Sequence, residues 1–162
     1  MIMFDGDGWR FNYRVAGILL DGDRVLLERD VESGTCCLPG GRVEFGEAAS
    51  EATLREMREE LGVEVKIERL IWAVDNFFQM DGQRYHEPSF YFLVSLPEAS
   101  ALPKGESFAN QDNSRTVLQW YALDDLDDVP LYPTFLRSGL EALPSEPAYM
   151  VHRDTPLDGD GT

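Results

Sequence analysis

One segment constrains the fold of this chain more than any other: residues 47–61, which read as a helix with a narrow apolar stripe. At about 100° per residue, Leu54, Met57 and Leu61 fall on one side of it. An isolated helix of this length is marginal in water and is stabilised mainly by packing its apolar face. The segment therefore predicts a helix docked on a core that the rest of the chain provides.

The same helix has a second, acidic face. Glu56, Glu59 and Glu60 lie within roughly 100° of one another. Like charges four residues apart on a helix repel, at a cost of about 0.2–0.5 kcal/mol per pair. A helix that only faced solvent would balance its charges better, so the crowding indicates that this face binds a cation.

The loop before the helix fits such a site. In "PGGRVEFGE", Gly40, Gly41 and Gly46 suit a strained loop with free backbone carbonyls. Carboxylates together with a carbonyl form a cage of hard oxygen ligands, which suits Mg²⁺ or Mn²⁺. Both ions bind substrate phosphates alongside carboxylates, and a bound cation would cancel the repulsion among the glutamates.

The charge of the whole chain narrows the class of partner. Thirty acidic residues against fourteen basic ones leave a net charge of −16. Such a surface repels nucleic acid and anionic membranes, so we expect neither a nucleic acid duplex nor a membrane as partner. No apolar run approaches the ~20 residues of a membrane span, and no signal peptide is recognisable.

The cysteines indicate the compartment. Cys36 and Cys37 are adjacent and poorly placed for a structural disulfide. We interpret them as small buried side chains in a reducing environment, which predicts a cytoplasmic location. A redox or metal role for the pair is the alternative.

The order of elements predicts the fold class. Two strands at 14–30 surround a turn at Asp21-Gly22, the helix at 47–61 follows, and two more strands surround a turn at 81–83. Then come a loop at 97–115, a strand at 116–123 and a helix from Pro133 with leucines at 136, 140 and 143. Strands, helix, strands, helix favour an α+β fold with a mixed sheet between helices. We expect one domain at 1–150 and a flexible tail at 151–162.

At this point the residues resemble a known family. The Nudix hydrolase signature is G-x5-E-x7-R-E-U-x-E-E-x-G-U, with U aliphatic. The chain matches it without departure, at Gly41, Glu47, Arg55, Glu56, Met57, Glu59, Glu60, Gly62 and Val63. The resemblance implies an α/β/α sandwich in which the signature forms a loop–helix–loop metal site.

The resemblance also implies roles. Glu56 and Glu60 would be the principal metal ligands, Glu59 would share the cluster, and the carbonyl of Gly40 would complete the shell. Arg55 would orient the glutamates through charge-assisted hydrogen bonds. The remaining signature acid, at position 47, would pair with this arginine or brace the loop.

The sequence leaves open which residue acts as the general base. Many Nudix enzymes carry a further acidic residue in the loop before the last strand. In "ANQDNSRTVL" only Asp112 is acidic, and Glu106 lies further back. The base is missing, is Asp112, or has moved into the helix as Glu59 or Glu56.

The reaction implied is metal-dependent hydrolysis of a nucleoside diphosphate linked to another group, in which water attacks phosphorus. The partner is then a small nucleotide derivative, and the family also makes a homodimer an open expectation. The rival interpretation is a catalytically silent Nudix module that binds a nucleotide. Such modules usually lose signature glutamates, and this chain keeps them all.

The substrate contacts are predicted near the second hairpin. Phe77, Phe78 and Tyr85 could stack on a nucleobase, because aromatic rings accept any base, or they could simply pack the hairpin. His86 and Glu87 form either a substrate contact or a strand-edge pair. We take Phe77, Tyr85 and Glu87 as the candidate substrate-binding residues.

Overall fold

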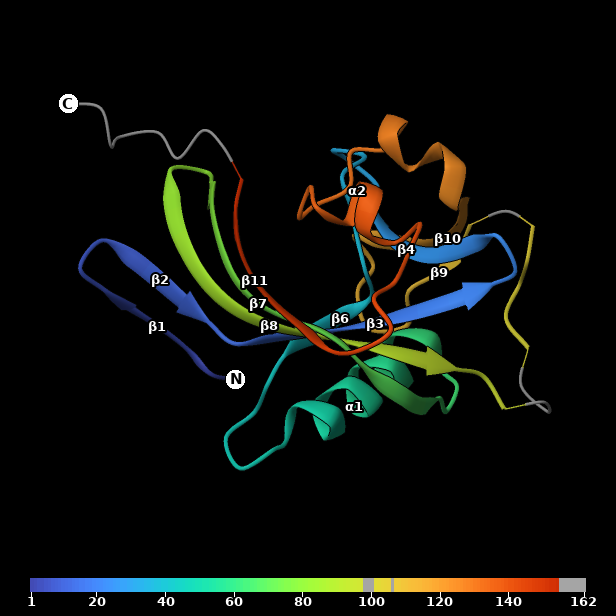
Figure 1. Cartoon of the computed structure of the whole chain (residues 1–162), viewed down its shortest axis with the longest axis horizontal. Coiled ribbons are helices and arrows are strands. Elements are labelled where there is room, and N and C mark those ends of the chain that lie inside the picture. Colours follow the sequence, from blue (N-terminus) through green and yellow to red (C-terminus); the bar gives the residue numbers. More distant parts are fainter. Residues whose placement is uncertain (98–100, 106, 155–162) are drawn as a thin grey trace.

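A strongly curved mixed sheet forms the body of the computed structural model, which describes residues 1–97, 101–105 and 107–154 (Figure 1). The strands are β1 (Met3–Gly6), β2 (Trp9–Asn12), β3 (Arg14–Asp21), β4 (Arg24–Asp30), β5 (Cys36–Cys37), β6 (Gly40–Arg42), β7 (Lys66–Met80), β8 (Gln83–Ser95), β9 (Phe108–Ala109), β10 (Thr116–Ala122) and β11 (Ala148–Arg153). The helices are α1 (Ala49–Leu61), the 3-10 helix η1 (Leu123–Asp128) and α2 (Leu136–Gly139).

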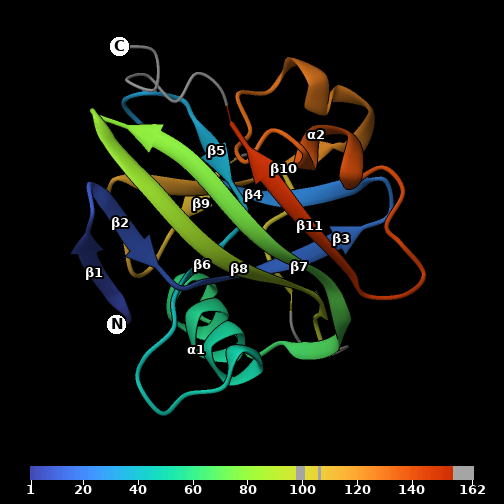
Figure 2. The same cartoon turned by 60° about the vertical axis from the view of Figure 1, so that its left-hand side comes forward.

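The sheet has the strand order β1-β2-β8-β3-β4-β10-β9, with β7 beside β8 and β11 beside β7. The pairs β2–β8, β3–β8 and β7–β11 are parallel, and the remaining pairs are antiparallel. Helix α1 lies on one side of the sheet, and α2 with η1 on the other (Figures 1 and 2). This arrangement confirms the predicted α/β/α sandwich around a mixed sheet.

Alternating side chains of the central strands feed two apolar cores. In β3, Gly17 faces α1, where an added Cβ would lie 2.7 Å from the sulfur of Met57, whereas Ile18 belongs to the core on the α2 side. In β4, Leu26 joins Met57 and Leu61 in the core under α1. The predicted stripe of α1 is therefore confirmed as its buried face.

Both predicted hairpins are present. The β3–β4 loop consists of Gly22 and Asp23, and Gly22 has a φ of 61°. The β7–β8 loop consists of Asp81 and Gly82, with φ values of 52° and 77°. In the β7–β8 loop φ is positive at both positions, and in the β3–β4 loop at the first position, Gly22; both patterns match the right-handed twist of the flanking strands.

The predicted boundaries near the C-terminus change. Helix α2 is shorter than predicted at both ends: it begins at Leu136 and not at Pro133, and it ends at Gly139, after which the N–H of Glu141 donates to the carbonyl of Ser138 in a bond of the 3-10 type. Strand β11 crosses the boundary expected at residue 150 and pairs with β7 as far as Arg153. The part of the expected tail that follows, residues 155–162, lies outside the described residues.

The N-terminal hairpin of β1 and β2 has no counterpart in the sequence-based prediction. It extends the sheet through the parallel pairing of β2 with β8. Among the described helices, none is long and apolar enough to cross a membrane.

Candidate metal and active site

Helix α1 begins and ends at positions that place its glutamates at one end of the sheet. The Glu51 carboxylate accepts the backbone N–H of Ala48 at 2.8 Å, which satisfies a donor at the helix start. Gly62 ends the helix with a φ of 73°, a left-handed conformation that glycine adopts without strain. The three signature glutamates therefore lie in the last two turns.

The loop backbone at β6 lies directly on the helix. A Cβ at Gly41 would lie 2.3 Å from the carboxyl carbon of Glu56, and a Cβ at Gly40 would lie 2.1 Å from the carbonyl oxygen of Val15. Only glycine leaves room for these approaches. The two signature-region glycines thus let the loop pass between β3 and the Glu56 carboxylate.

Arg55 connects the acidic residues. Its Nε and Nη2 donate to the two carboxylate oxygens of Glu47 at 2.7 and 2.9 Å, a bidentate pair. Its Nη1 donates to Glu56 at 2.7 Å and to Glu59 at 3.3 Å. The guanidinium also holds the pKa of Glu47 below its usual range. The Arg55 guanidinium thus holds the loop carboxylate and the helix carboxylates in place together.

Asp112 approaches the helix from another part of the chain. Its carboxylate and those of Glu56 and Glu59 have oxygen atoms that all lie within 4.8 Å of one another. These three side chains, which we call the outer cluster, come from α1 and from the loop before β10. The structure therefore brings the loop acid next to two signature glutamates, while Glu106 lies outside the described residues.

The neighbours of Asp112 fix its position. The buried Asn110 accepts the backbone N–H groups of Asp112 and Asn113 through its Oδ1, at 2.9 and 3.1 Å. The N–H of Gln111 donates to the carbonyl of Glu60 at 3.0 Å. The loop is therefore hydrogen-bonded to the end of α1 at the residue beside Asp112.

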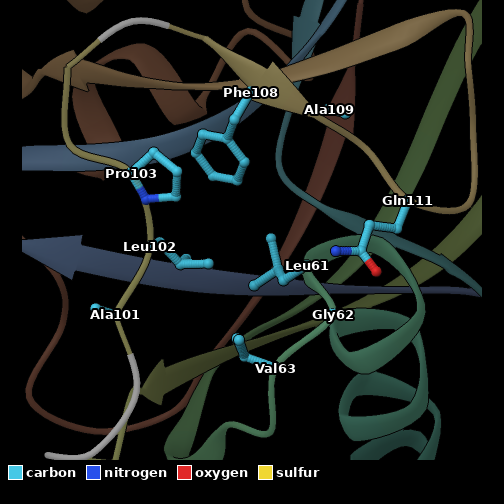
Figure 3. Close-up of a pocket in the computed structure, with 9 residues that line it drawn as sticks. All are labelled: Leu61, Gly62, Val63, Ala101, Leu102, Pro103, Phe108, Ala109 and Gln111. Carbon is cyan, nitrogen blue, oxygen red and sulfur yellow. The ribbon is translucent and has the colours of Figure 1, made fainter.

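Figure 3 shows the far side of this junction. The Gln111 amide reaches over Gly62, and Leu102 and Phe108 point toward Leu61. Here an open apolar pocket of about 350 Å³ lies between the end of α1 and residues 101–103. Among the described residues that line it, none carries a carboxylate, so the acidic chemistry lies on the opposite side of the junction.

Glu60 differs from the outer cluster because it is buried. It is 5% exposed, and its Oε2 has no hydrogen-bond partner within the described part of the chain. Burial raises its pKa to about 9, with further contributions from the charges of Glu28 and Glu56, while Arg14 and the backbone amide of Gly40 act in the opposite direction. An unpaired buried carboxylate is costly, and a hard cation would satisfy it. The donor set of this site therefore fits Mg²⁺ or Mn²⁺.

A cleft of about 320 Å³ joins these groups. Its acidic lining includes Glu56, Glu60 and Asp112, and Gly40 and Gly41 form part of the wall. Two arginines, from β3 and β6, also line it. The arrangement places carboxylates for a cation and guanidinium groups for a phosphate in one space.

Among the lining residues that were not predicted from the sequence, Arg14 and Glu28 come from the central strands β3 and β4. Each is a charged residue in a strand otherwise rich in buried apolar side chains. A charged residue directly beside a run of buried apolar residues is the feature of the sequence that could have identified them.

The predicted substrate residues do not line the cleft. Phe77 is directly opposite His86 and Phe78 directly opposite Tyr85 in the β7–β8 ladder. Neighbouring side chains along a strand point to opposite faces, so Phe77 and Tyr85 lie on different sides of the sheet. A base on one face could not stack on both.

Each of the three has partners inside the protein. Phe77 stacks on His86 with ring centroids 4.5 Å apart. Tyr85 is 9% exposed and stacks on Phe78 at 4.8 Å. Glu87 is buried and accepts hydrogen bonds from Asn12 and from the Ser89 hydroxyl. In this structure these contacts tie the hairpin together.

Both cysteines are free, and their positions differ. Cys36 is buried, whereas Cys37 is half-buried and lines the cleft, with its Sγ 3.9 Å from Oε2 of Glu28. Burial raises the pKa of the Cys37 thiol to about 12, so the sulfur is protonated near neutral pH. The cleft therefore offers a cation oxygen ligands and not a thiolate.

Comparisons with known proteins agree with this geometry. The family model of the NUDIX domain matches residues 10–141. An uncharacterised Nudix hydrolase of Bacillus subtilis, YvcI, is 28% identical over 116 residues, covering 72% of this chain and 69% of its own. An RNA pyrophosphohydrolase of Ruthia magnifica is 30% identical over 153 residues, covering 84% of each chain. A mutator MutT protein of Bacillus halodurans has the same fold, with a TM-score of 0.65 at 22% identity over 90% of this chain and 91% of that one.

Proposed function

This chain belongs to the Nudix hydrolase family, as the signature indicated, and we propose that it is a metal-dependent pyrophosphohydrolase. It would cleave a nucleoside diphosphate linked to another group, within the phosphate chain. The observation that carries the proposal is the meeting of Glu56, Glu59 and Asp112 within 4.8 Å, together with the buried Glu60, whose Oε2 has no hydrogen-bond partner among the described residues.

The metal would be Mg²⁺ or Mn²⁺, held by Glu56, Glu59 and Glu60 with the carbonyl of Gly40. When bound, a divalent cation neutralises charge on a pyrophosphate and makes an adjacent water easier to deprotonate. The carboxylates are of the hard type that these ions prefer.

The protein's own residues would do the rest. Arg55, through its hydrogen bonds to Glu56 and Glu59, keeps both carboxylates aimed at the site. The proton of the attacking water would pass to Glu59, whose side chain is 42% exposed, or to Asp112 beside it. Arg14 in the cleft wall would contact the phosphate chain.

A short phosphate chain suits this protein best. A net charge of −16 penalises each additional uncompensated phosphate, although salt screens that repulsion beyond ~8 Å. The preferred substrate would be a nucleoside triphosphate, a nucleotide sugar or an ADP-ribose-type compound. Long dinucleoside polyphosphates and capped RNA would be poor substrates.

A second candidate is removal of pyrophosphate from the 5′ end of RNA. It is favoured by the name of the Ruthia magnifica relative, which spans most of the chain. The charge of this chain argues against it, because binding a polyanion normally depends on basic side chains.

The test is a substrate panel with Mg²⁺ or Mn²⁺. It would contain nucleoside triphosphates, nucleotide sugars, ADP-ribose, diadenosine polyphosphates, 5′-triphosphate RNA, capped RNA and a phosphomonoester. Product masses after reaction in ¹⁸O-water would identify the attacked phosphorus. Best turnover on the monoester or on either RNA would refute the proposed substrate class. Binding without any turnover would support the silent-module alternative.

Two further predictions concern the whole protein. A cytoplasmic location follows from the free cysteines, and fractionation of cells would check it. A homodimer is expected from the family resemblance, and light scattering on purified protein would measure the mass.

A further inference from the structure

Glu28 lies in strand β4 and lines the cleft of the proposed metal site. Along β4, Leu26 and Glu28 point to the same face because side chains alternate. Leu26 packs in the core with Met57 and Leu61 of α1. Glu28 is the next side chain in that row, is 8% exposed and lines the cleft together with Glu60.

The two carboxylates approach the cleft from different walls, Glu28 from the sheet and Glu60 from the helix. Arg14 lines the same cleft, but its charge also acts on Cys37 and Glu87.

Arg14 does not complete the coordination of this pair. Its hydrogen bond within the described part of the chain is a long one, 3.4 Å, to the carbonyl oxygen of Leu38. The Oε2 of Glu60 is left buried with no partner among the described residues. Two carboxyl groups that face one cleft, one of them with an unsatisfied oxygen, leave a position suited to a cation.

We propose that Glu28 is a further metal ligand, and that Glu28 and Glu60 hold a divalent cation at an inner position beside the outer cluster. The inference rests on the proposed metal-dependent function. It adds a ligand from β4, outside the signature, so the cation would join the sheet to α1. The ion would be a hard one such as Mg²⁺ or Mn²⁺, because two carboxylates face it.

The test is Glu28→Gln, which removes the charge and keeps the size. Mn²⁺ binding would be measured by calorimetry, and the melting temperature with and without Mn²⁺. Without metal, the melting temperature should be no lower than that of the wild type, because the amide keeps the size of Glu28 and its oxygen can still accept from the Cys37 thiol. The Mn²⁺ affinity should fall by about tenfold or more, and the stabilisation by Mn²⁺ should shrink.

Glu87→Gln is the matched control. Glu87 is 6% exposed and, like Glu28, interacts with the charge of Arg14. Its carboxylate, however, accepts hydrogen bonds from Asn12 and Ser89. This variant should melt at a lower temperature both with and without metal. Its Mn²⁺ affinity should match that of the wild type.

The outcomes separate the two claims. Unchanged Mn²⁺ affinity in Glu28→Gln overturns the role of Glu28 and leaves the metal-dependent function intact. A lower metal-free melting temperature, or failure to fold, overturns it too, because Glu28 would then be a structural partner of Arg14. If the wild type itself binds no Mn²⁺, both this inference and the proposed function fail.

Discussion

Two buried glutamates, Glu60 in the cleft and Glu87 under the β7–β8 hairpin, show opposite solutions to the same problem. They are 5% and 6% exposed. Glu87 accepts hydrogen bonds from Asn12 and Ser89. Glu60 has other carboxylates as neighbours and one oxygen that finds no partner in the described ranges.

The surroundings of Glu87 form a closed network. Asn12, which donates to Glu87, also accepts a hydrogen bond from the Nε of Arg42. A network in which each member is satisfied rigidifies the structure and has no need of a ligand. The difference teaches that burial alone does not mark a functional carboxylate here. The unsatisfied oxygen is what distinguishes Glu60, the proposed metal ligand, from Glu87.

The strongest test of the comparison is Glu60→Gln. We expect turnover to fall by about 10³-fold or more, because a ligand that supports charge stabilisation is lost. The metal-free protein should keep its fold and melt no lower than the wild type, since the amide replaces a buried carboxyl that the metal-free fold already holds protonated near neutral pH. Turnover and the unfolding midpoint should be measured on the same preparation. Near wild-type turnover would sink the metal assignment.

Gly41→Ala tests whether the loop positions the cleft carboxylates. The added Cβ would collide with the Glu56 carboxyl, 2.3 Å away, so Glu56 has to move. We expect turnover to fall about 10²-fold, the usual effect of a displacement of about 1 Å. Gly6→Ala, with nothing within 4 Å of the added atom, is the control. Equal turnover of both variants would contradict the close approach.

Asp112→Asn tests the outer cluster. We expect a smaller loss than for Glu60→Gln, roughly tenfold, if the base lies in α1 and Asp112 only adds charge. Single-turnover rates at saturating Mg²⁺ would measure it. A loss equal to that of Glu60→Gln would instead assign the general base to Asp112.

Glu87→Gln sharpens the comparison from the structural side. The free energy of unfolding should fall by about 1–3 kcal/mol, because a charged acceptor in a buried network is lost. Denaturant unfolding would measure this change. The Mg²⁺ concentration that gives half-maximal turnover should not move, and a large shift in it would mean that the network is part of the metal site.

The smallest expected effect is a pH dependence of the metal-free protein. The pKa of Glu60 is about 9 when folded, against an ordinary value of 4.5 for a glutamate, so between these values the folded state holds a proton that the unfolded chain releases. Stability therefore declines as pH rises through this window. The melting temperature without metal should fall between about pH 6 and 9, and the Glu60 part of this slope should vanish in Glu60→Gln. An identical slope in that variant would assign the effect to other groups.

Much of this protein follows from local rules. The two hairpin turns need only Gly22 and the Asp81-Gly82 pair, whose backbone angles suit tight turns. The stripe and the acidic face of α1 follow from a period of about 3.6 residues. The signature identified the family because its glycines and glutamates all lie within one continuous loop–helix–loop segment.

Other features depended on contacts between distant parts of the chain. Glu28 and Asp112 join Glu60 and Glu56 only because β4 and the loop before β10 come together at the end of α1. The choice between a stacking platform and a packed hairpin for Tyr85 depended on which face of the sheet it occupies. The close approach of Gly139 to Trp72 and the parallel pairing of β11 with β7 likewise join segments that lie far apart in the sequence. Sequence periodicity reports which face of one element is buried, whereas the neighbours of that face are set by pairings dozens of residues away.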